Sequence, residues 1–411
     1  MRILFTITGP WGTGAATVVD GVAKELLRLG HQVKILFPDL GLPSPDAERY
    51  YGNTGLYHII KFPRTHRGVH FHTFPLMIPD PNPRNLRGAW TYRDMTDAQL
   101  EAFKDLMRLE LRKAARGFKP DIVAVQHAWL MGHIVRELGL PYIVGTHNSD
   151  QMGFRFDERM RPYAVSCAQG AGYVWALSPA AKRDIRKLYG LPAGKVVLIP
   201  NGYDEDVFYP RRLDKREVFA RYGIKADPKL PVISFVGKLS RTKGFDTLVD
   251  ANPLIQAQQP STVLLFGSGA LEDVYGKAVA PRHKMKRMRL MGHLPPAAIS
   301  ECLNISDVSV LPSRHEGFGV AALEAMGCGV PVVATRVGHF EHFVVGGLIE
   351  PDDPRDLARA TLEILADSPR ARQVTSIRAY ETALTYSWRS STIQRLAYYK
   401  RALAKAARSR G

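Results

Sequence analysis

Short apolar runs alternate along the chain with segments in which apolar side chains recur at helical spacing. Residues 2–8 form the first run, Val18, Val22 and Leu26 follow with a spacing of four, and residues 32–37 form the next run. A period near 3.6 between two apolar runs predicts a strand, a helix and a second strand. This is the repeating unit of a parallel sheet.

The same alternation continues through most of the chain. Thr96, with Gln99 three residues later, predicts a capping box at the start of a helix that ends before Gly117. The segment 41–90 interrupts the alternation because it is rich in proline, and we expect loops with short strands there. Strands are predicted at residues 2–8, 32–37, 57–62, 69–74, 121–126, 142–146, 174–177, 196–199, 232–236, 262–266, 289–291, 308–311 and 330–334.

These strands form two consecutive β/α arrays separated by a charged, turn-rich stretch between Pro200 and Leu230. We therefore expect an α/β protein with two facing Rossmann-like domains, residues 1–200 and 201–386. In such folds the ligand binds beyond the carboxyl ends of the strands, here in an interdomain cleft. Residues 387–411 contain basic residues and no acidic ones, and their spacing predicts an amphipathic C-terminal helix.

The net charge of the chain is unusual. The 411 residues include 56 Lys and Arg against 39 Asp and Glu, a formal charge of +17. This excess favours an anionic partner or a solvated basic surface. The three cysteines are widely spaced and exclude a disulfide framework or a Cys-x-x-Cys metal site. The first apolar run is too short for a signal peptide, so we expect a cytoplasmic protein.

Two loops that follow predicted strands are suited to phosphate binding. Residues 9–16 join a strand to a helix, but Gly12 and Gly14 lack the third glycine of a dinucleotide fingerprint. This loop either receives an anion or is only a tight turn. Residues 235–244 place Lys238, Arg241 and Lys243 after another strand, which suits a diphosphate or a solvated loop.

Residues 311–327 are the most informative stretch. Glu316 lies in a loop after a predicted strand, and a helix is expected to begin near Gly319. The backbone amides of Gly319 and Val320 would point toward an anion. Glu324 lies farther along this helix, where its carboxylate could accept hydrogen bonds from two vicinal hydroxyls. The structural alternative is a helix-capping Glu316 and a solvated Glu324.

Together these motifs resemble retaining glycosyltransferases of the two-Rossmann GT-B architecture, family 4 type (glycosyl transferases group 1). The strongest match is the Glu-x7-Glu pattern from Glu316 to Glu324. In two places the chain departs from the family pattern: Lys238 replaces the usual Arg, and the segment 338–341 is shortened. Further matches are residues 199–204, 237–244, 267–269, 331–335 and 351–354, Gly292 and, in the first half, the glycine loop, residues 30–33, His127 and residues 146–147.

The resemblance implies roles for individual residues. Lys238 and Lys243 would hold the donor diphosphate together with the amides of Gly319 and Val320, and Glu316 would contact the transferred sugar. Glu324 would accept from the ribose hydroxyls. Gly292 would lie against the base, Gly12 would close over the phosphates, and His127 would approach the sugar. It also implies that the helix of residues 387–411 packs back on the first domain.

The resemblance implies transfer of a sugar from a nucleoside-diphosphate sugar to an acceptor hydroxyl, with retention of configuration. Cations and helix amides can stabilise the leaving diphosphate, so we expect no metal and no cofactor. The Asp-x-Asp at residues 204–206 lies beside an Asn-Gly turn and is not interpreted as a metal site. The acceptor is expected to be a sugar, a lipid-linked molecule or another small molecule, and no nucleic-acid partner is expected.

Two alternatives remain open from the sequence. The first glycine loop fits an NAD-type oxidoreductase, although its fingerprint is incomplete. The basic charge fits a non-catalytic protein that binds nucleic acid or membranes. For a transferase, the same charge indicates either a solvated surface or peripheral attachment to the inner face of an anionic membrane.

Overall fold

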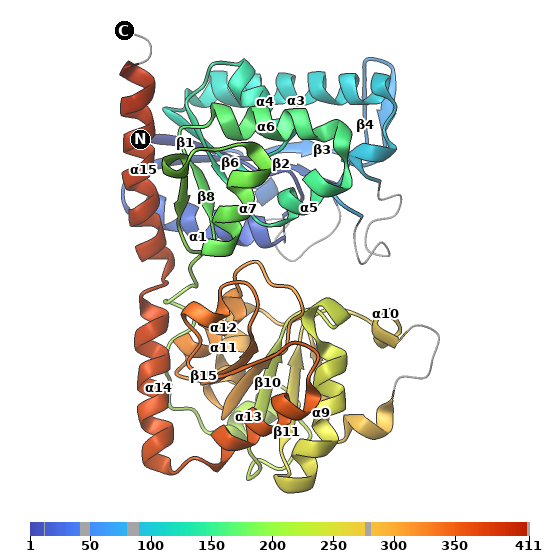
Figure 1. The fold of residues 1–411 in the computed structure, drawn as a ribbon, viewed down its shortest axis with the longest axis vertical. Helices are drawn as coiled ribbons and strands as arrows, with labels where there is room; N and C mark the ends of the chain where they lie inside the picture. The colour runs from blue at the N-terminus through green and yellow to red at the C-terminus, as the bar shows by residue number, and fades with distance from the viewer. Residues whose placement is uncertain (12, 42–49, 80–89, 276–280, 409–411) are drawn as a thin grey trace. The chain divides into compact units, whose positions relative to one another are not determined.

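The computed structural model describes residues 1–11, 13–41, 50–79, 90–275 and 281–408. The chain forms two compact units (Figure 1). Unit 1 consists of Met1–Pro200 with Ser391–Gly411, and unit 2 consists of Asn201–Ser390. Each unit is built around its own parallel sheet, so the predicted α/β class with two Rossmann-like sheets is confirmed.

Unit 1 contains a seven-stranded parallel sheet in the order β3-β2-β1-β6-β7-β8-β9. The order reverses between β1 and β6, which creates the topological switch point at which such sheets bind ligands. Its strands are β1 (Arg2–Thr6), β2 (Gln32–Asp39), β3 (Tyr57–Lys61), β6 (Ile122–Gln126), β7 (Tyr142–Gly145), β8 (Val174–Ala176) and β9 (Val196–Leu198), with the helices α1 (Gly14–Arg28), α3 (Asp97–Phe118), α4 (Leu130–Glu137), α5 (Ser149–Phe156), α6 (Arg161–Gly170), α7 (Pro179–Tyr189) and α15 (Trp388–Arg408).

Helices cover both faces of this sheet. One face is buried by α3, α4, α6 and α7, and its core includes Val174 and Ala176 of β8. Figure 1 shows α3 and α4 on one side of the sheet and α1 on the other. Trp175 points to the face opposite Val174, because successive strand residues alternate. It packs against Tyr399 of α15 with ring centroids 5.5 Å apart, and the guanidinium of Arg395 lies over the same indole at 4.9 Å.

Unit 2 contains a six-stranded parallel sheet in the order β12-β11-β10-β13-β14-β15. Here the order reverses between β10 and β13. The strands are β10 (Val232–Val236), β11 (Thr262–Phe266), β12 (Met288–Gly292), β13 (Val308–Leu311), β14 (Val332–Thr335) and β15 (Gly346–Ile349), with the helices α8 (Lys215–Arg221), α9 (Phe245–Gln258), α10 (Leu271–Tyr275), α11 (Pro296–Asn304), α12 (Val320–Gly327), α13 (Pro354–Ala366) and α14 (Pro369–Leu384).

The two faces of the second sheet are buried by different helices. Ile233 and Phe235 of β10 point into a core formed with α9 and α13. Val232, one residue away, points to the other face, where α8 and α11 contribute Phe219 and Cys302. Burial on both faces explains why β10 and β13 are predominantly apolar.

Some predicted elements differ from those observed. The segment 69–74 contains only β5 (Val69–Phe71), which pairs antiparallel with β4 (Arg64–His66) outside the parallel sheet. Strand β15 was not predicted. Much of the proline-rich segment, at residues 42–49 and 80–89, lies outside the described residues. In the part of the chain that the structure describes, no helix is long and apolar enough to cross a membrane.

Candidate functional site

The loop after β10 presents two lysines at the carboxyl edge of the unit 2 sheet. Ser240 caps the short turn of Arg241–Lys243 by accepting from the Lys243 amide at 3.4 Å. Gly244 then adopts a φ of 66°, and a Cβ there would lie 1.8 Å from the carbonyl oxygen of Pro312. The absence of a side chain at Gly244 therefore lets the lysine loop, residues 237–244, pack against the loop that follows β13. Lys238 is exposed, and within the described residues it has no ion-pair partner.

Arg314 fastens the loop after β13 to the lysine loop. Its backbone amide donates to the carbonyl of Thr242 at 2.9 Å. Its guanidinium pairs with the Asp246 carboxylate at 2.7 and 2.9 Å. Two charge-assisted hydrogen bonds of this kind fix direction as well as distance. The two loops therefore form one preorganised edge beyond the neighbouring strands β10 and β13.

Lys243 and Glu316 meet at this edge. Lys243 Nζ donates to Glu316 Oε2 at 2.5 Å, and the two side chains are 31% and 16% exposed. The second carboxylate oxygen of Glu316 accepts from the Gly317 amide at 3.2 Å. The structure thus brings together two residues predicted to bind different parts of one ligand.

Helix α12 begins beside this pair. Gly319 precedes the helix with a φ of 93°, and a Cβ at Gly319 would lie 2.0 Å from the ring of Phe340. Glycine is therefore required by both backbone conformation and packing. Amides in the first turn of a helix, including that of Val320, have no intrahelical acceptor. They supply partial positive charge suited to an anion.

Glu324 lies farther along α12. Burial, reinforced by the nearby carboxylate of Asp204, raises the pKa of Glu324 to about 7. A carboxyl group in this environment is poised between its neutral and charged forms at neutral pH. Glu324 is partly exposed, intermediate between a buried and a solvated position.

Gly292 ends β12 with a φ of 69° and is exposed. Its carbonyl accepts from the Gly267 amide at 2.8 Å, which connects the ends of β11 and β12. A Cβ at Gly292 would have no atom within 4 Å, so the space beside it is open. A flat ring could approach the backbone there.

In unit 1 the predicted residue His127 immediately follows β6. It is buried, has a φ of 77°, and its Nδ1 has no hydrogen-bond partner among the described residues. Burial lowers the pKa of His127 below its ordinary value, although Asp150 opposes the shift. Nδ1 is itself buried, so a ligand does not reach this nitrogen in the arrangement that the structure describes.

Asp150 was not singled out from the sequence. Its carboxylate is fully buried and accepts from two backbone amides, those of Ala128 and His147, each at 3.0 Å. His147 Nε2 in turn donates to Gln126 Oε1 at 2.8 Å, and its ring lies 4.9 Å from that of His127. Asp150 thus connects the loops after β6 and β7, the two loops that carry these histidines.

The glycine loop is only partly described. Gly12, predicted to close over phosphates, lies outside the described residues. Thr13 caps α1 by accepting from the Ala16 amide at 3.4 Å. Trp11 packs on Phe37 and Tyr57 with centroid distances of 5.2 and 5.3 Å.

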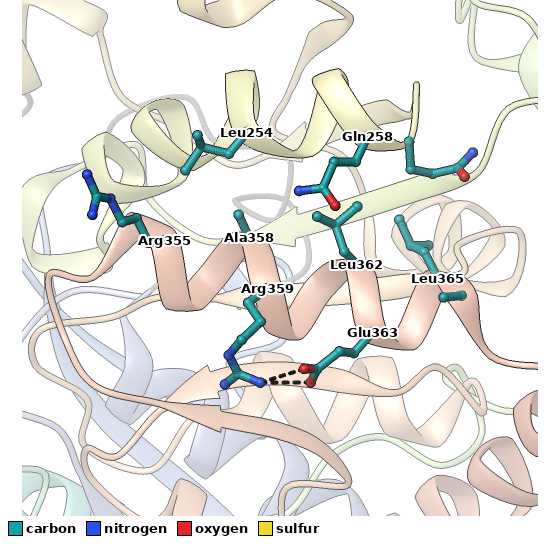
Figure 2. A pocket seen from close by; sticks show the side chains of 10 residues that line it. Leu254, Gln258, Arg355, Ala358, Arg359, Leu362, Glu363 and Leu365 are labelled. Carbon is teal, nitrogen blue, oxygen red and sulfur yellow. Dashed lines mark hydrogen bonds and ion pairs between the residues drawn. The ribbon is translucent and has the colours of Figure 1, made fainter.

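A groove between α9 and α13 lies apart from these residues. Figure 2 shows Ala358 and Leu362 pointing toward α9, whereas Arg359 and Glu363 form an ion pair on the other side of α13. The groove uses the last turns of α9, the end opposite Lys243. We assign it no role in the candidate site.

Two family models match the chain in succession. The model described as Glycosyltransferase Family 4 matches residues 12–207, and the model described as Glycosyl transferases group 1 matches residues 230–367. Together they include every strand of the two parallel sheets except β1, and every residue predicted for the site.

Individual proteins give the same picture. The chain is 32% identical over 267 residues to a D-inositol 3-phosphate glycosyltransferase of Kineococcus radiotolerans, an alignment that covers 59% of the chain and 60% of that relative. The fold of this chain matches that of sucrose-phosphate synthase from Thermosynechococcus elongatus with a TM-score of 0.70 at 20% identity. The match covers 98% of this chain and 100% of the synthase chain. HepE of Anabaena, solved with UDP, matches with a TM-score of 0.70 at 18% identity over 97% and 99%.

Proposed function

Because the chain belongs to the family 4, group 1 glycosyltransferases of GT-B architecture, we propose that it transfers a sugar from a nucleoside-diphosphate sugar to an acceptor hydroxyl. We further propose that the transfer retains the anomeric configuration and needs no metal. The observation that supports this most strongly is the carboxyl edge of the unit 2 sheet. There Lys243, Glu316 and the start of α12 converge, with Lys238 free of an ion-pair partner within the described residues.

The charges at this edge suit the proposed bond cleavage. The bond between the sugar and the diphosphate breaks, and its electron pair leaves with the diphosphate. Lys238, Lys243 and the amide of Val320 would stabilise the negative charge that develops there. Preorganised cations and amides stabilise such charge without a metal ion.

Carboxylates would orient the two ends of the donor. Glu316 would accept from hydroxyls of the transferred sugar, and Glu324 would accept from the ribose hydroxyls. Gly292 would leave room for the base. The UDP bound by HepE makes uridine the first base to test.

In unit 1 we propose that His127, at the carboxyl end of β6, approaches the transferred sugar. An acceptor hydroxyl would attack the sugar carbon from the face that the diphosphate leaves, and its proton would pass to a leaving phosphate oxygen. The sugar, the lipid-linked molecule and the small molecule predicted as acceptor classes all offer such a hydroxyl.

The alternatives are less well supported. The family matches do not favour an NAD-type oxidoreductase or a non-catalytic binding protein. The NAD alternative rests on the glycine loop of residues 9–16, whose dinucleotide fingerprint lacks its third glycine.

A donor screen tests the proposal. Purified protein is incubated with UDP-, GDP- and ADP-sugars, with and without sugar or lipid acceptors, and release of nucleoside diphosphate is measured. We expect release with one class of donor, and a loss of about a hundredfold or more in Lys243→Ala, as when one electrostatic stabiliser of a leaving group is removed. Lys229→Ala, at an exposed lysine of the same unit, is the matched control and should keep full activity. Release by no donor, or equal release by both variants, would overturn the proposal.

A further inference from the structure

Unit 1 has a cavity at the opposite edge of its sheet from His127 and His147. The cavity has a volume of about 330 Å³ and lies where β7 begins at Tyr142. The histidines instead follow the carboxyl ends of β6 and β7. Three cations line the cavity from three separate elements: Arg136 in α4, Lys195 in the turn of Ala193–Lys195, and Lys405 in α15.

The charge of this cavity is uncompensated. Among the described residues, no carboxylate lines it. Glu137, the neighbour of Arg136, is engaged by Arg108 at 2.8 Å and by His133 at 3.2 Å. The pKa of Lys195 is lowered by burial and by the nearby positive charges of Lys405 and Arg136. Like charges are thus held together without an opposing one, an arrangement that an anion would relieve.

The existing partners of the cations leave donors unused. Arg136 Nη1 donates to the carbonyl of Ser166 at 3.0 Å, and Lys195 Nζ donates to the carbonyl of Gln169 at 2.5 Å. A guanidinium has five N–H donors and an ammonium has three, so each retains free donors. Lys405 is exposed and forms no ion pair with the described residues.

Glycines give the cavity its shape. A Cβ at Gly170 would lie 2.4 Å from the Tyr142 hydroxyl and 2.6 Å from Cδ of Arg136. A Cβ at Gly172 would lie 2.7 Å from Cβ of Ala402 in α15. The missing side chains allow Arg136 and α15 to approach the sheet edge closely.

We infer that this cavity binds the phosphate group of a phosphate monoester. Three cations from different directions can each engage a separate oxygen of a phosphate, and charge-assisted hydrogen bonds of this kind are strong. The same group occurs in inorganic phosphate, in phosphorylated small molecules and in the headgroup of phosphatidic acid. The inference does not depend on the proposed transferase function, because it involves none of the residues assigned to donor binding.

A phosphate bound in the cavity would connect α15 to the rest of unit 1. Lys405 belongs to α15, whereas Arg136 belongs to α4 and Lys195 to the turn of Ala193–Lys195. A ligand that binds only the docked helix stabilises that docking by mass action. Bound phosphate should therefore slow amide hydrogen exchange in the second half of α15.

Equilibrium dialysis with radiolabelled inorganic phosphate tests the cavity directly. It is performed on the full chain at fixed ionic strength with chloride as the competing anion, and is followed by hydrogen exchange on α15. We expect saturable binding and slower exchange in the wild type. Binding should weaken about tenfold in Lys405→Ala and in Lys195→Ala, because each loses one charge-assisted hydrogen bond.

Lys400→Ala is the matched control, since Lys400 is also exposed on α15 but does not line the cavity. Binding of phosphate by the loop that carries Lys243 would be unchanged in Lys405→Ala, so this variant distinguishes the two sites.

Sedimentation with phosphatidylcholine vesicles, with and without phosphatidic acid, shows whether the bound phosphate group belongs to a lipid or to a soluble molecule. If the protein binds phosphatidic acid, and this binding depends on Lys405 and is competed by phosphate, the ligand is a lipid headgroup. If only free phosphate binds in a Lys405-dependent way, the ligand is a soluble molecule. The inference is overturned if neither probe binds saturably, or if binding is unaffected by Lys405→Ala or is equally weakened by Lys400→Ala.

Discussion

Lys243 and Glu316 form an ion pair between the loops that follow β10 and β13, with Lys243 Nζ 2.5 Å from Glu316 Oε2. Both residues are proposed to bind the donor, Lys243 at the diphosphate and Glu316 at the sugar. The Glu316 carboxylate accepts one of the three N–H groups of the Lys243 ammonium. A bound diphosphate would therefore compete with Glu316 for Lys243.

Replacing Glu316 with Gln separates these two roles. Glu316→Gln frees Lys243, so nucleoside diphosphate without a sugar should bind a few-fold more tightly, in keeping with about 0.2–1 kcal/mol for a partly exposed ion pair. Sugar transfer should nevertheless fall, because a carboxylate that accepts from the sugar hydroxyls has been lost. Calorimetry and turnover measured on the same preparation check both effects. A Glu316→Gln enzyme that binds the diphosphate less tightly would show that the pair does not compete with the ligand.

The affinity for nucleoside diphosphate should depend on pH through Glu324. Its pKa is raised to about 7, so the carboxyl is largely neutral below that pH. The charged form is the better acceptor for two ribose hydroxyls. Affinity should therefore decrease as the pH falls from 8 to 6.

The diphosphate itself also takes up protons in this range, so the wild type is compared with Glu324→Gln. In that variant the decrease with falling pH should be smaller, and affinity at pH 8 should be lower than in the wild type. Titration calorimetry at several pH values measures both curves. Parallel curves for the two proteins would remove Glu324 from ribose binding.

Alanine at position 319 should destabilise unit 2. Gly319 has a φ of 93°, and the added methyl would lie 2.0 Å from the ring of Phe340. Backbone strain and overpacking each cost about 1–3 kcal/mol, so we expect a loss of about 2 kcal/mol or more. Gly194→Ala is the control, because Gly194 has ordinary φ and a methyl group there would have no atom within 4 Å. Urea denaturation compares the stability of Gly319→Ala with that of Gly194→Ala. Equal denaturation midpoints for the two variants would refute the close packing of Gly319 on Phe340.

Asp150 should maintain the arrangement of His127 and His147. Asp150→Ala removes the acceptor for two buried amides, at a cost of about 1–3 kcal/mol for each unsatisfied group. Asp150→Asn keeps one carboxamide oxygen as an acceptor and should therefore lose less stability than Asp150→Ala. Asp97→Ala, at a carboxylate 93% exposed in its pair with Arg159, should change stability little. Thermal unfolding measures stability, and turnover shows whether Asp150→Asn affects kcat at nearly unchanged stability. An Asp150→Ala protein as stable as Asp97→Ala would contradict this role.

The sequence predicts best where a strand is buried on both faces. The boundaries of β10, β11 and β13 agree with the structure, because each is a short, mostly apolar run between turn residues. The capping box at Thr96 and Gln99 is also present as predicted. Strand β15 begins with two glycines and shows no alternation, so its pairing with β14 depends on tertiary contacts that local pattern does not reveal.

The candidate site was only partly predictable for a similar reason. Glu316, Gly319 and Glu324 lie within one recognisable motif, whereas the partner of Glu316 is 73 residues away along the chain. Asp150 acts through backbone amides, which any residue can supply, and so it leaves no sequence motif. The raised pKa of Glu324 arises from burial and from Asp204, and both require the folded chain.

The central claim is that the Lys243 loop of unit 2 holds a nucleoside diphosphate. Titration calorimetry with UDP, GDP, ADP and NAD on the wild type, Lys243→Ala and the control Lys229→Ala tests it most directly. The account predicts saturable binding of at least one nucleoside diphosphate by the wild type and by Lys229→Ala. It predicts binding weaker by about tenfold or more in Lys243→Ala, since a hydrogen bond to a charged group is lost. Binding of NAD alone, or identical affinities in all three proteins, would contradict it.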